Sequence, residues 1–322
     1  MHPKTPSLSV LLASYNGEKF IAQQIRSIVA QTYTDFQLII CDDNSQDATV
    51  NIIQTFLSKY PNIVLYRNKT TLGYVRNFEK LIGLCHTPYI ALCDQDDIWE
   101  RDKLEKQMRH MQMSETKHPT LPVLIHSDLT VHDANGSKLY PSYFAYRGYV
   151  LGKRKDLGHI LGPCGVMGNT ILFNHALKKL ILPFPPMLKN HDYWIALVCE
   201  LFGTRVTLDT PLVQYRLHTD NASNPLIATT ATQHSMQYYL RCLRGICRLP
   251  YTGTQRENVL EYLLEHYTVD DEARRIIEAF LKYLRLQGSK SGRIYDMMRY
   301  AYVKKHIPFQ IKTALKILFK SQ

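Results

Sequence analysis

The sequence predicts an α/β protein with a mostly parallel central sheet flanked by helices, followed by a helical C-terminal region. Short β-rich runs alternate with longer helix-like stretches from residue 8 to residue 130, which is the pattern of βαβ units. The strand-like character ends near Asn224 and Pro225. We therefore expect one domain over residues 1–224 and a helical, basic region over residues 225–322.

Local patterns predict the individual elements. Strand-like runs cover residues 8–13, 36–41, 63–66, 89–93 and 123–126. Residues 18–30 and 48–60 are expected to be helical, because apolar side chains such as Ile21, Ile25 and Ile28 recur about one turn apart. A Rossmann-like sheet of this kind binds ligands beyond the carboxyl ends of its strands.

The composition is that of a globular protein, with 45% hydrophobic and 21% charged residues among 322. The first residues lack the apolar run of a signal peptide, and no stretch approaches the roughly 18 to 20 apolar residues that span a bilayer. We therefore expect a cytoplasmic protein. Seven cysteines without a CxxC pair predict free thiols rather than disulfides or a zinc site.

Polar residues follow three of the predicted strands. Ser14 begins one turn, Asp42 and Asp43 begin another, and Asp94 and Asp96 belong to a third. Because the carboxyl ends of parallel strands meet at one edge of a sheet, these side chains should converge. No GxGxxG or GxxxxGK[ST] turn is present, which argues against a dinucleotide-binding enzyme or a P-loop NTPase.

The third turn has two interpretations from its residues alone. Asp94 and Asp96 offer the hard oxygen ligands that suit Mg²⁺ or Mn²⁺. Alternatively, they belong to a solvated acidic turn in which Asp97 caps a following helix.

Four motifs together resemble glycosyltransferase family 2. Residues 7–50 are similar to the opening of that family, and residues 89–103 are similar to its metal-binding Asp-x-Asp segment. The resemblance continues through residues 190–194 and 214–218, and so covers about two-thirds of the chain. It implies the GT-A type of α/β fold and an inverting transfer of a sugar from a nucleotide-activated donor.

The resemblance implies a donor site on the sheet. Asp43 would lie near the nucleotide base, and Arg216 would pair with the diphosphate. Without the family, Arg76 would be read as a surface charge at the start of a helix. The residues that the resemblance assigns to the donor are Ala13, Tyr15, Glu18, Asp43, Arg76, Asn77 and Arg216.

The resemblance also implies a divalent cation, Mn²⁺ or Mg²⁺. Asp96 would be its principal ligand, Asp94 would act directly or through water, and His218 would contribute an imidazole. The ion would offset the charge that develops on the leaving nucleoside diphosphate.

Asp192 is the residue that the resemblance assigns as catalytic base. It precedes the apolar, helix-like residues 193–202, where an aspartate alone would be interpreted as a helix N-cap. The acceptor hydroxyl must lose its proton as it attacks C1, so a carboxylate within about 3 Å is required. Relatives often carry an acidic residue just before this aspartate, and His191 departs from that pattern.

The residue pattern of 191–194 together with that of 215–221 resembles the bacterial rhamnosyltransferase branch, which builds surface polysaccharides of the cell envelope. The donor stays open between dTDP-rhamnose, UDP-glucose and UDP-galactose, and the acceptor would be a saccharide or a lipid-linked saccharide. A noncatalytic sugar-nucleotide or glycan-binding module on the same fold is one alternative, and a nucleotidyltransferase is another. The latter normally needs a glycine-rich, basic loop after the first strand, which residues 14–18 do not form.

The C-terminal region is basic, because residues 225–322 hold 16 Lys and Arg against 8 Asp and Glu, a difference of +8. Residues 272–286 and 311–320 combine apolar and basic residues at helical spacing. These helices either pack on the catalytic domain or make a peripheral contact with the anionic inner face of a membrane. No nucleic-acid-binding motif is present, so we expect no nucleic-acid partner. The apolar residues of the last segment are Ile311, Leu315, Leu318 and Phe319, beside Lys312, Lys316 and Lys320.

Overall fold

A computed structural model describes residues 6–151, 155–219, 221, 249–252, 255–304 and 307–319 of the chain. The chain divides into two compact units. The first contains the described residues of Met1–Tyr146, Lys153–Lys155 and Val166–Arg216, and the second contains those of Arg147–Gly152, Asp156–Gly165 and Leu217–Gln322. The boundary predicted at Asn224 and Pro225 lies outside the described residues.

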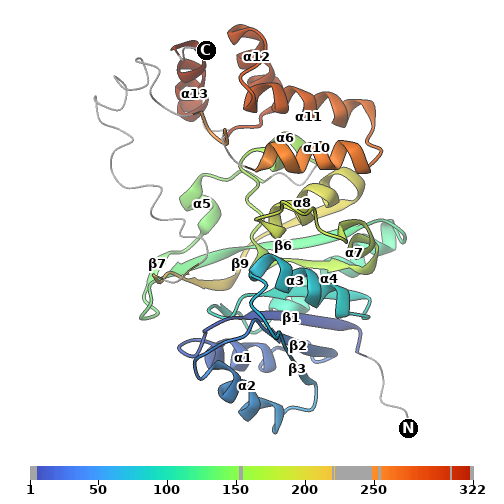
Figure 1. The fold of residues 1–322 in the computed structure, drawn as a ribbon, viewed down its shortest axis with the longest axis vertical. Helices are drawn as coiled ribbons and strands as arrows, with labels where there is room; N and C mark the ends of the chain where they lie inside the picture. Colours follow the sequence, from blue (N-terminus) through green and yellow to red (C-terminus); the bar gives the residue numbers. More distant parts are fainter. Residues whose placement is uncertain are drawn as a thin grey trace. The chain divides into compact units, whose positions relative to one another are not determined.

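The first unit is built on a mixed sheet (Figure 1). Its strand order is β3-β2-β1-β4-β8-β6-β9-β5, and β7 pairs with β6. Strands β1 to β4 are parallel to one another, and β6 is parallel to β9, whereas β8 is antiparallel to β4 and β6. The strands are β1 (Leu8–Ser14), β2 (Phe36–Asp42), β3 (Ile63–Arg67), β4 (Tyr89–Cys93), β5 (Ile98–Trp99), β6 (Val123–His132), β7 (Lys138–Tyr140), β8 (Leu172–Asn174) and β9 (Thr204–Arg216).

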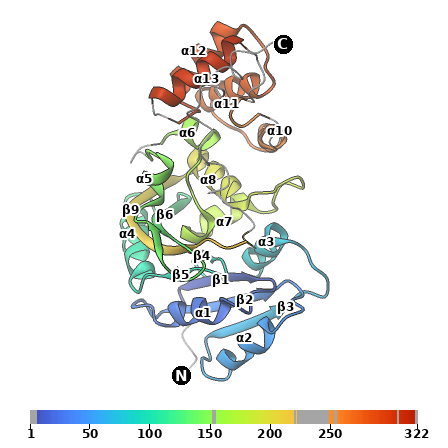
Figure 2. The same ribbon diagram turned by 90° about the vertical axis from the view of Figure 1, so that its left-hand side faces the viewer.

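Helices cover both faces of the N-terminal strands. Helices α1 (Ile21–Val29) and α2 (Thr49–Leu57) lie on one face of β1–β3, and α3 (Tyr74–Leu84) lies on the other (Figures 1 and 2). Strand β1 is therefore buried on both faces and mostly apolar, with Leu8, Val10 and Leu11 fully buried. The predicted α/β class, with a largely parallel sheet between helices, is confirmed.

The remaining helices of the first unit follow the central strands. Helix α8 leads into β9 through Gly203, where an added Cβ would lie 2.2 Å from the carbonyl oxygen of Pro122. Only glycine permits so close an approach of the two backbones. These elements are α4 (Lys103–Lys117), α5 (Tyr143–Arg147), whose last residue falls in the second unit, the 3-10 helix η1 (Gly168–Thr170), α7 (His175–Ile181) and α8 (His191–Phe202).

A buried ion pair joins the end of α8 to the start of β9. The carboxylate of Glu200 accepts a hydrogen bond from Nε of Arg205 at 2.8 Å, and both side chains are almost entirely buried. Nη1 of Arg205 also donates to Oγ1 of Thr207 at 2.6 Å. Such a pair needs both partners, because either charge left in the interior without the other would be costly.

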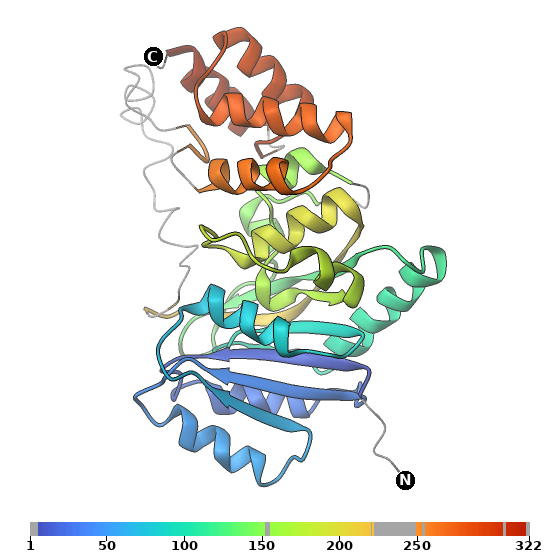
Figure 3. The ribbon, with the colours of Figure 1, turned by 45° about the vertical axis from the view of Figure 1, so that its right-hand side comes forward.

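The described part of the second unit is helical (Figure 3). Its core contains three aromatic rings, those of Phe280, Tyr283 and Tyr302, whose centroids lie 5.0 to 6.0 Å apart. A Cβ at Gly162 would lie 1.9 Å from the carbonyl oxygen of Tyr302, so this glycine allows close backbone packing. The helices are α6 (Leu157–Leu161), α10 (Arg256–His266), α11 (Asp271–Leu284), α12 (Lys290–Tyr300) and α13 (Ile307–Phe319).

Helices α11 and α13 confirm the two helices predicted in the basic region, but they bury their apolar residues differently. In α11, Ile277 and Phe280 are fully buried. In α13, Ile317 and Thr313 are buried, whereas Ile311, Leu318 and Phe319 are 55%, 46% and 47% exposed. Of the predicted apolar residues of α13, these three therefore face solvent in the described structure.

The described residues include most of the cysteines and the helices that could be compared with a membrane span. Five of its seven cysteines fall within the described residues, and all five are buried free thiols; Cys242 and Cys247 lie outside those residues. None of the helices in the described ranges is both long and apolar enough to cross a membrane.

Substituting Glu200 tests the buried ion pair. Glu200→Leu should lower the free energy of unfolding by about 3 to 5 kcal/mol, because Arg205 loses its carboxylate partner in the interior. Urea unfolding followed by tryptophan fluorescence reports on the first unit, since Trp99 and Trp194 both belong to it. The double variant Glu200→Leu/Arg205→Met should recover most of the loss. If the double variant is as unstable as Glu200→Leu, the loss of stability does not come from leaving the charge of Arg205 unpaired.

Candidate active site

The carboxyl ends of β1, β2 and β4 lie side by side. Ser14 pairs with Asp42 in the β1–β2 register, and Leu12 pairs with Cys93 between β1 and β4. The turns that follow these strands therefore meet at one edge of the sheet, as the strand pattern predicted.

Gln95 joins the first and third of these turns. Its amide oxygen accepts the backbone N–H of Tyr15, and its amide nitrogen donates to the carbonyl of the same residue, both at 2.9 Å. Gly17 makes room for it, because a Cβ there would lie 2.2 Å from the Gln95 oxygen. Two predicted donor residues are thus located: the Tyr15 side chain is exposed, and Ala13 is half-buried beside Cys41 of β2.

Glu18 joins the first turn to the second. Its carboxylate accepts the backbone N–H of Ala48 at 2.9 Å, and the hydroxyl of Thr49 accepts the N–H of Gly17 at 2.7 Å. The side chain that was predicted to contact the donor thus also holds the start of α2 against the end of β1.

Asp43 and Asn77 lie in one buried polar network at the end of β2. The Asp43 carboxylate accepts the N–H of Gly73 at 2.8 Å and the side-chain amide of Asn68 at 2.7 Å. Asn77 donates to the carbonyl of Cys41 at 2.8 Å and accepts from Asn68 at 3.1 Å. The two predicted donor residues are therefore brought together, and both shape the loop that enters α3.

Three carboxyl groups lie close enough to interact electrostatically beyond β4. Burial, and then the negative charges of Asp96 and Asp192, raise the pKa of Asp94 to about 8. The fold thus places Asp192, almost 100 residues later in the sequence, beside the predicted metal-binding turn. This proximity is the central electrostatic feature of the site.

The residues present fit a divalent cation held by few protein ligands. Within the described ranges, no three His, Cys, Asp or Glu side chains are grouped so that they could hold a metal ion. Asp94 and Asp96 form a pair, and Mg²⁺ or Mn²⁺ commonly binds through one or two carboxylates together with waters and substrate phosphates. A cation near this pair would also reduce the cost of holding its negative charges together.

Asp97 has a structural role that differs from the capping role considered above. It is fully buried, it accepts the side-chain amide of Asn169 at 2.5 Å, and it accepts the backbone N–H of Arg216 at 3.3 Å. Helix α4 begins only at Lys103, after Asp102. Burial raises the pKa of Asp97 well above its usual range, and the charges of the preceding aspartates act in the same direction.

Arg216 and His218 fall in different units. Nη2 of Arg216 donates to the side-chain oxygen of Gln23 at 2.6 Å, and the guanidinium lies 4.7 Å from the ring centroid of Phe20. His218 belongs to the second unit, where its backbone N–H donates to the side chain of Asn221 at 2.6 Å. Its role as a metal ligand stays a prediction.

Asp192 lies in the first turn of α8 and is not its N-cap. The N-cap residue is Asn190, and the Asp192 carboxylate accepts the N–H of Tyr193 at 2.7 Å. The first turn favours a negative charge, because the helix dipole is positive there. The position therefore suits a carboxylate, but Asp192 does not cap the helix, because Asn190 is the N-cap residue.

His191 is a buried neutral imidazole beside this carboxylate. Burial lowers its pKa to about 3, and neither ring nitrogen has a hydrogen-bond partner in the described structure. The ring stacks on Phe78 with centroids 4.3 Å apart. A Cβ at Gly168 would lie 2.9 Å from Nε2, so the glycine of η1 accommodates this ring.

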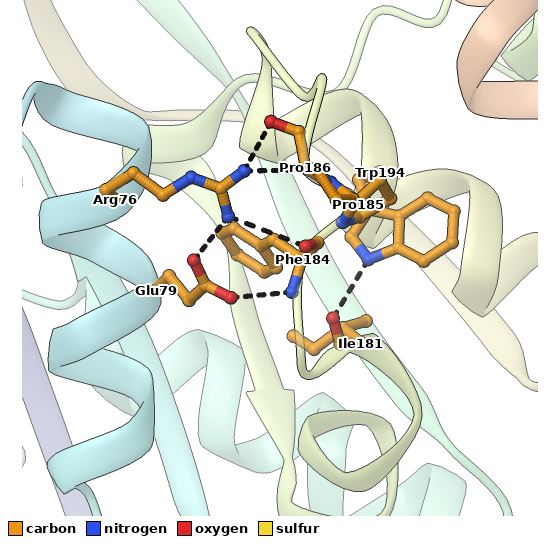
Figure 4. A network of polar contacts seen from close by, with 7 residues as sticks. All are labelled: Arg76, Glu79, Ile181, Phe184, Pro185, Pro186 and Trp194. Atoms are coloured by element: carbon orange, nitrogen blue, oxygen red, sulfur yellow. Dashed lines mark hydrogen bonds and ion pairs between the residues drawn. The ribbon is translucent and has the colours of Figure 1, made fainter. Parts of the chain in front are cut away.

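Arg76 bonds to Glu79 and to the segment that precedes α8. Its guanidinium pairs with Glu79 at 2.5 Å and donates to the carbonyls of Pro185 and Pro186 at 2.8 and 2.7 Å (Figure 4). These partners use both terminal nitrogens. The geometry supports a structural role for Arg76, and its contact with the donor stays a prediction.

Tyr74 is a site residue that the sequence interpretation missed. Burial, and then the charges of Asp192 and Asp94, raise the pKa of its hydroxyl, which places the residue near both carboxylates. Its side chain is nevertheless 46% exposed. Its position directly after Gly73, at the start of the motif that contains Arg76, was the only signal in the sequence that could have indicated it.

Comparison with known proteins identifies relatives over part or most of the chain. The dTDP-rhamnosyl transferase RfbG of Shigella flexneri is 32% identical over 136 residues, which are 41% of this chain and 43% of that protein. The chain thus spans less than half the length of this relative. The UDP-Glc:alpha-D-GlcNAc-diphosphoundecaprenol beta-1,3-glucosyltransferase WfaP of Escherichia coli is 24% identical over 221 residues, 67% of this chain and 79% of that protein.

Solved structures share the fold. TarS residues 1–349 from S. aureus, solved with UDP-GlcNAc, give a TM-score of 0.55 at 14% identity and cover 97% of this chain and 89% of theirs. The mannosyltransferase PcManGT from Pyrobaculum calidifontis, solved with GDP-Man and Mn²⁺, gives 0.53 at 14% identity over 98% of this chain and 88% of its own. These similarities confirm the predicted GT-A type of fold.

The sequence model of glycosyl transferase family 2 matches residues 9–173, just over half of the 322 residues. That segment contains β1 from Ser9 onward, β2 to β4, the three turns at the carboxyl ends of β1, β2 and β4, the Asp94 and Asp96 pair, and α3. By sequence, and with a fold that agrees, this chain belongs to glycosyl transferase family 2.

Proposed function

We propose that this chain is a metal-dependent, inverting glycosyltransferase that moves a sugar from a nucleoside-diphosphate donor to a saccharide or lipid-linked saccharide acceptor. The observation that carries the proposal is the meeting of Asp192 with Asp94 and Asp96 at the carboxyl end of β4. Asp192 can accept a proton from the acceptor, while Asp94 and Asp96 can hold the cation that binds the diphosphate.

The donor is a nucleotide sugar bound over the turns after β1 and β2. The exposed ring of Tyr15 and the polar network around Asp43 lie there. The relatives support this class of donor, since one is a dTDP-rhamnosyl transferase and a structure with the same fold was solved with UDP-GlcNAc. dTDP-rhamnose is the first donor to test, followed by UDP-glucose and UDP-galactose.

Asp96 and Asp94 would hold Mn²⁺ or Mg²⁺. When bound, the cation stabilises the negative charge of the leaving diphosphate. A structure of the same fold that was solved with GDP-Man and Mn²⁺ supports this assignment.

Asp192 acts as general base. As the acceptor oxygen bonds to the anomeric carbon, the bond from that carbon to the diphosphate breaks, and the diphosphate departs with the electron pair. The hydroxyl proton passes to the Asp192 carboxylate. Attack from the face opposite the leaving group inverts the anomeric configuration.

A peripheral contact with an anionic membrane surface is proposed for α13. Ile311, Leu318 and Phe319 are exposed on this helix, which also carries Lys312 and Lys316. Helix α12 lies beside it, because Nζ of Lys290 donates to the carbonyl of Leu318 at 2.8 Å. Apolar side chains and lysines on one exposed helix suit an interface with anionic lipid, where lipid-linked saccharides are found.

Replacing Asp96 tests the metal site. Asp96→Ala should abolish transfer and weaken Mn²⁺-dependent binding of the donor, because the diphosphate loses its cation. Isothermal titration of donor with and without Mn²⁺ measures this directly, and Asp102→Ala, which removes an aspartate paired with Lys106 on the surface, is the matched control. Transfer by Asp96→Ala within about threefold of wild type at saturating Mn²⁺ would contradict the assignment.

Replacing Asp192 tests the base. Asp192→Asn should reduce the turnover number by about 10² to 10⁴, the usual range for loss of a general base, while the affinity for donor is unchanged. The control is Asp209→Asn, which makes the same chemical change at an exposed position of β9. If the Asp192→Asn protein turns over normally but melts at a lower temperature, the carboxylate has only a structural role.

Replacing three exposed residues of α13 tests the membrane contact. Ile311→Ser/Leu318→Ser/Phe319→Ser should reduce co-sedimentation with anionic phospholipid vesicles several-fold and lower activity on a lipid-linked acceptor, but spare donor hydrolysis in solution. Deleting the helix would be a poorer test, because Ile317 is buried. Val64→Ser/Leu139→Ser removes exposed apolar residues of the first unit as a control.

The salt dependence of the same experiment separates packing from lipid binding. Binding should weaken between 0.1 M and 1 M salt, as the Debye length falls from about 10 Å to about 3 Å. Sedimentation of the triple variant equal to that of wild type would reject the membrane contact.

A further inference from the structure

Helix α3 contacts the segment that leads to Asp192 at several successive points. Arg76 donates to the carbonyls of Pro185 and Pro186 (Figure 4). Glu79 bonds to Arg76 through one carboxylate oxygen and accepts the N–H of Phe184 at 2.7 Å through the other. We refer to Tyr74, Arg76, Phe78 and Glu79 as the α3 clamp.

The clamp bonds to two successive proline carbonyls. Pro185 and Pro186 have no N–H to donate, so their carbonyls are the backbone polar groups that can be hydrogen-bonded, and that of Pro185 also accepts the N–H of Leu188 at 3.0 Å. The guanidinium of Arg76 is planar and presents several donors at once, which suits two adjacent carbonyls. An ammonium group at this position would not reproduce that geometry.

The aromatic members of the clamp hold the next part of the segment. The Tyr74 hydroxyl donates to the carbonyl of Lys189. The rings of Tyr74 and Phe78 contact the His191 ring, with centroids 6.0 and 4.3 Å away. Residues 74 and 78 are one helical turn apart, so they present their rings on the same side of α3.

Asp192 is also held from its C-terminal side. Trp194 is fully buried, and its indole N–H donates to the carbonyl of Ile181 at 2.9 Å (Figure 4). The segment from 181 to 194 is thus bonded to α3 at residues 184, 185, 186 and 189, and to itself through Trp194. Asp192 lies between the two anchors.

We propose that the α3 clamp positions the catalytic base, with Arg76 and Glu79 as positioning residues. The proposal rests on the proposed function, since it assumes that Asp192 takes the acceptor proton. A general base works only within hydrogen-bond reach of that proton, and a displacement of about 1 Å by a distant change can cost about 10²-fold in rate. A clamp that acts on the backbone before the base therefore affects turnover more than donor binding.

The test compares Arg76→Met, Glu79→Gln and the double variant. Each single variant should lower kcat for transfer about 10- to 100-fold, while KM for the donor and the Kd of its nucleoside diphosphate stay within about twofold. The double variant should be no worse than the poorer single one, because both residues act through the same contact. Arg76→Lys keeps the charge without the planar fork and should fall between wild type and Arg76→Met. Lys106→Met, which removes a surface cation paired with Asp102, is the control and should leave kcat unchanged.

Specific outcomes would overturn the proposal. If Arg76→Met weakens nucleotide binding more than tenfold while Glu79→Gln does not, Arg76 contacts the donor, as the family resemblance implied. If both variants retain wild-type kcat, or lose activity only in proportion to the fraction unfolded in a thermal scan, the clamp does not position the base. Asp192→Asn is assayed alongside the clamp variants. Normal turnover by Asp192→Asn refutes the role of Asp192 as general base. If Asp192→Asn loses turnover while the clamp variants stay fully active, only the positioning role of the clamp is refuted.

Discussion

The crowding of carboxylates beyond β4 is the constraint on which the rest of the first unit depends. Burial and two neighbouring carboxylates raise the pKa of Asp94 to about 8. Asp97, which follows Asp96 in the sequence, is fully buried, and its pKa is also raised. Each carboxylate brought to this edge makes the others harder to ionise, so the arrangement is unfavourable without compensation. The protein compensates locally with hydrogen bonds, such as those that Asp97 accepts from Asn169 and from the backbone of Arg216. The fit of the pair to a divalent cation follows from the same constraint.

The turns around this site are held mainly by side chains that bond to backbone groups. Beyond the end of a strand the ladder of hydrogen bonds stops, and the exposed N–H and carbonyl groups need other partners. Glu18, Asp43 and Gln95 supply them for three different turns. These residues therefore shape the turns to which the donor site is assigned by prediction. Substituting them would disturb the turn as well as any contact with a nucleotide, so a loss of affinity alone would not establish contact.

Helix α8 is stabilised at both ends, and this explains how a carboxylate in its first turn can hold a defined position. At its start, α3 bonds to the preceding segment, and Trp194 anchors the first turn to Ile181. At its other end, the buried pair of Glu200 and Arg205 connects it to β9. A helix held at both ends transmits a change at either end to the residues between them. The ion pair and the clamp thus hold the two ends of the helix that carries Asp192.

The alternation of strands and helices and the turns rich in carboxylates were readable from the linear chain, because periodicity and motif spacing are local properties. The role of Asp192 was implied by the family resemblance and stays a prediction. The strands β5, β7 and β8 were not predicted, since runs of two or three residues show no periodicity. The partners of Arg76 could not be predicted from the sequence either. Pro185 lies 109 positions away, and Arg76 contacts its backbone carbonyl, a group that every residue has. The proximity of Tyr74 to Asp94 and Asp192 likewise joins residues that are far apart in the sequence. Which backbone groups come within reach of a side chain depends on how α3, β4 and α8 pack, and only the folded chain decides that.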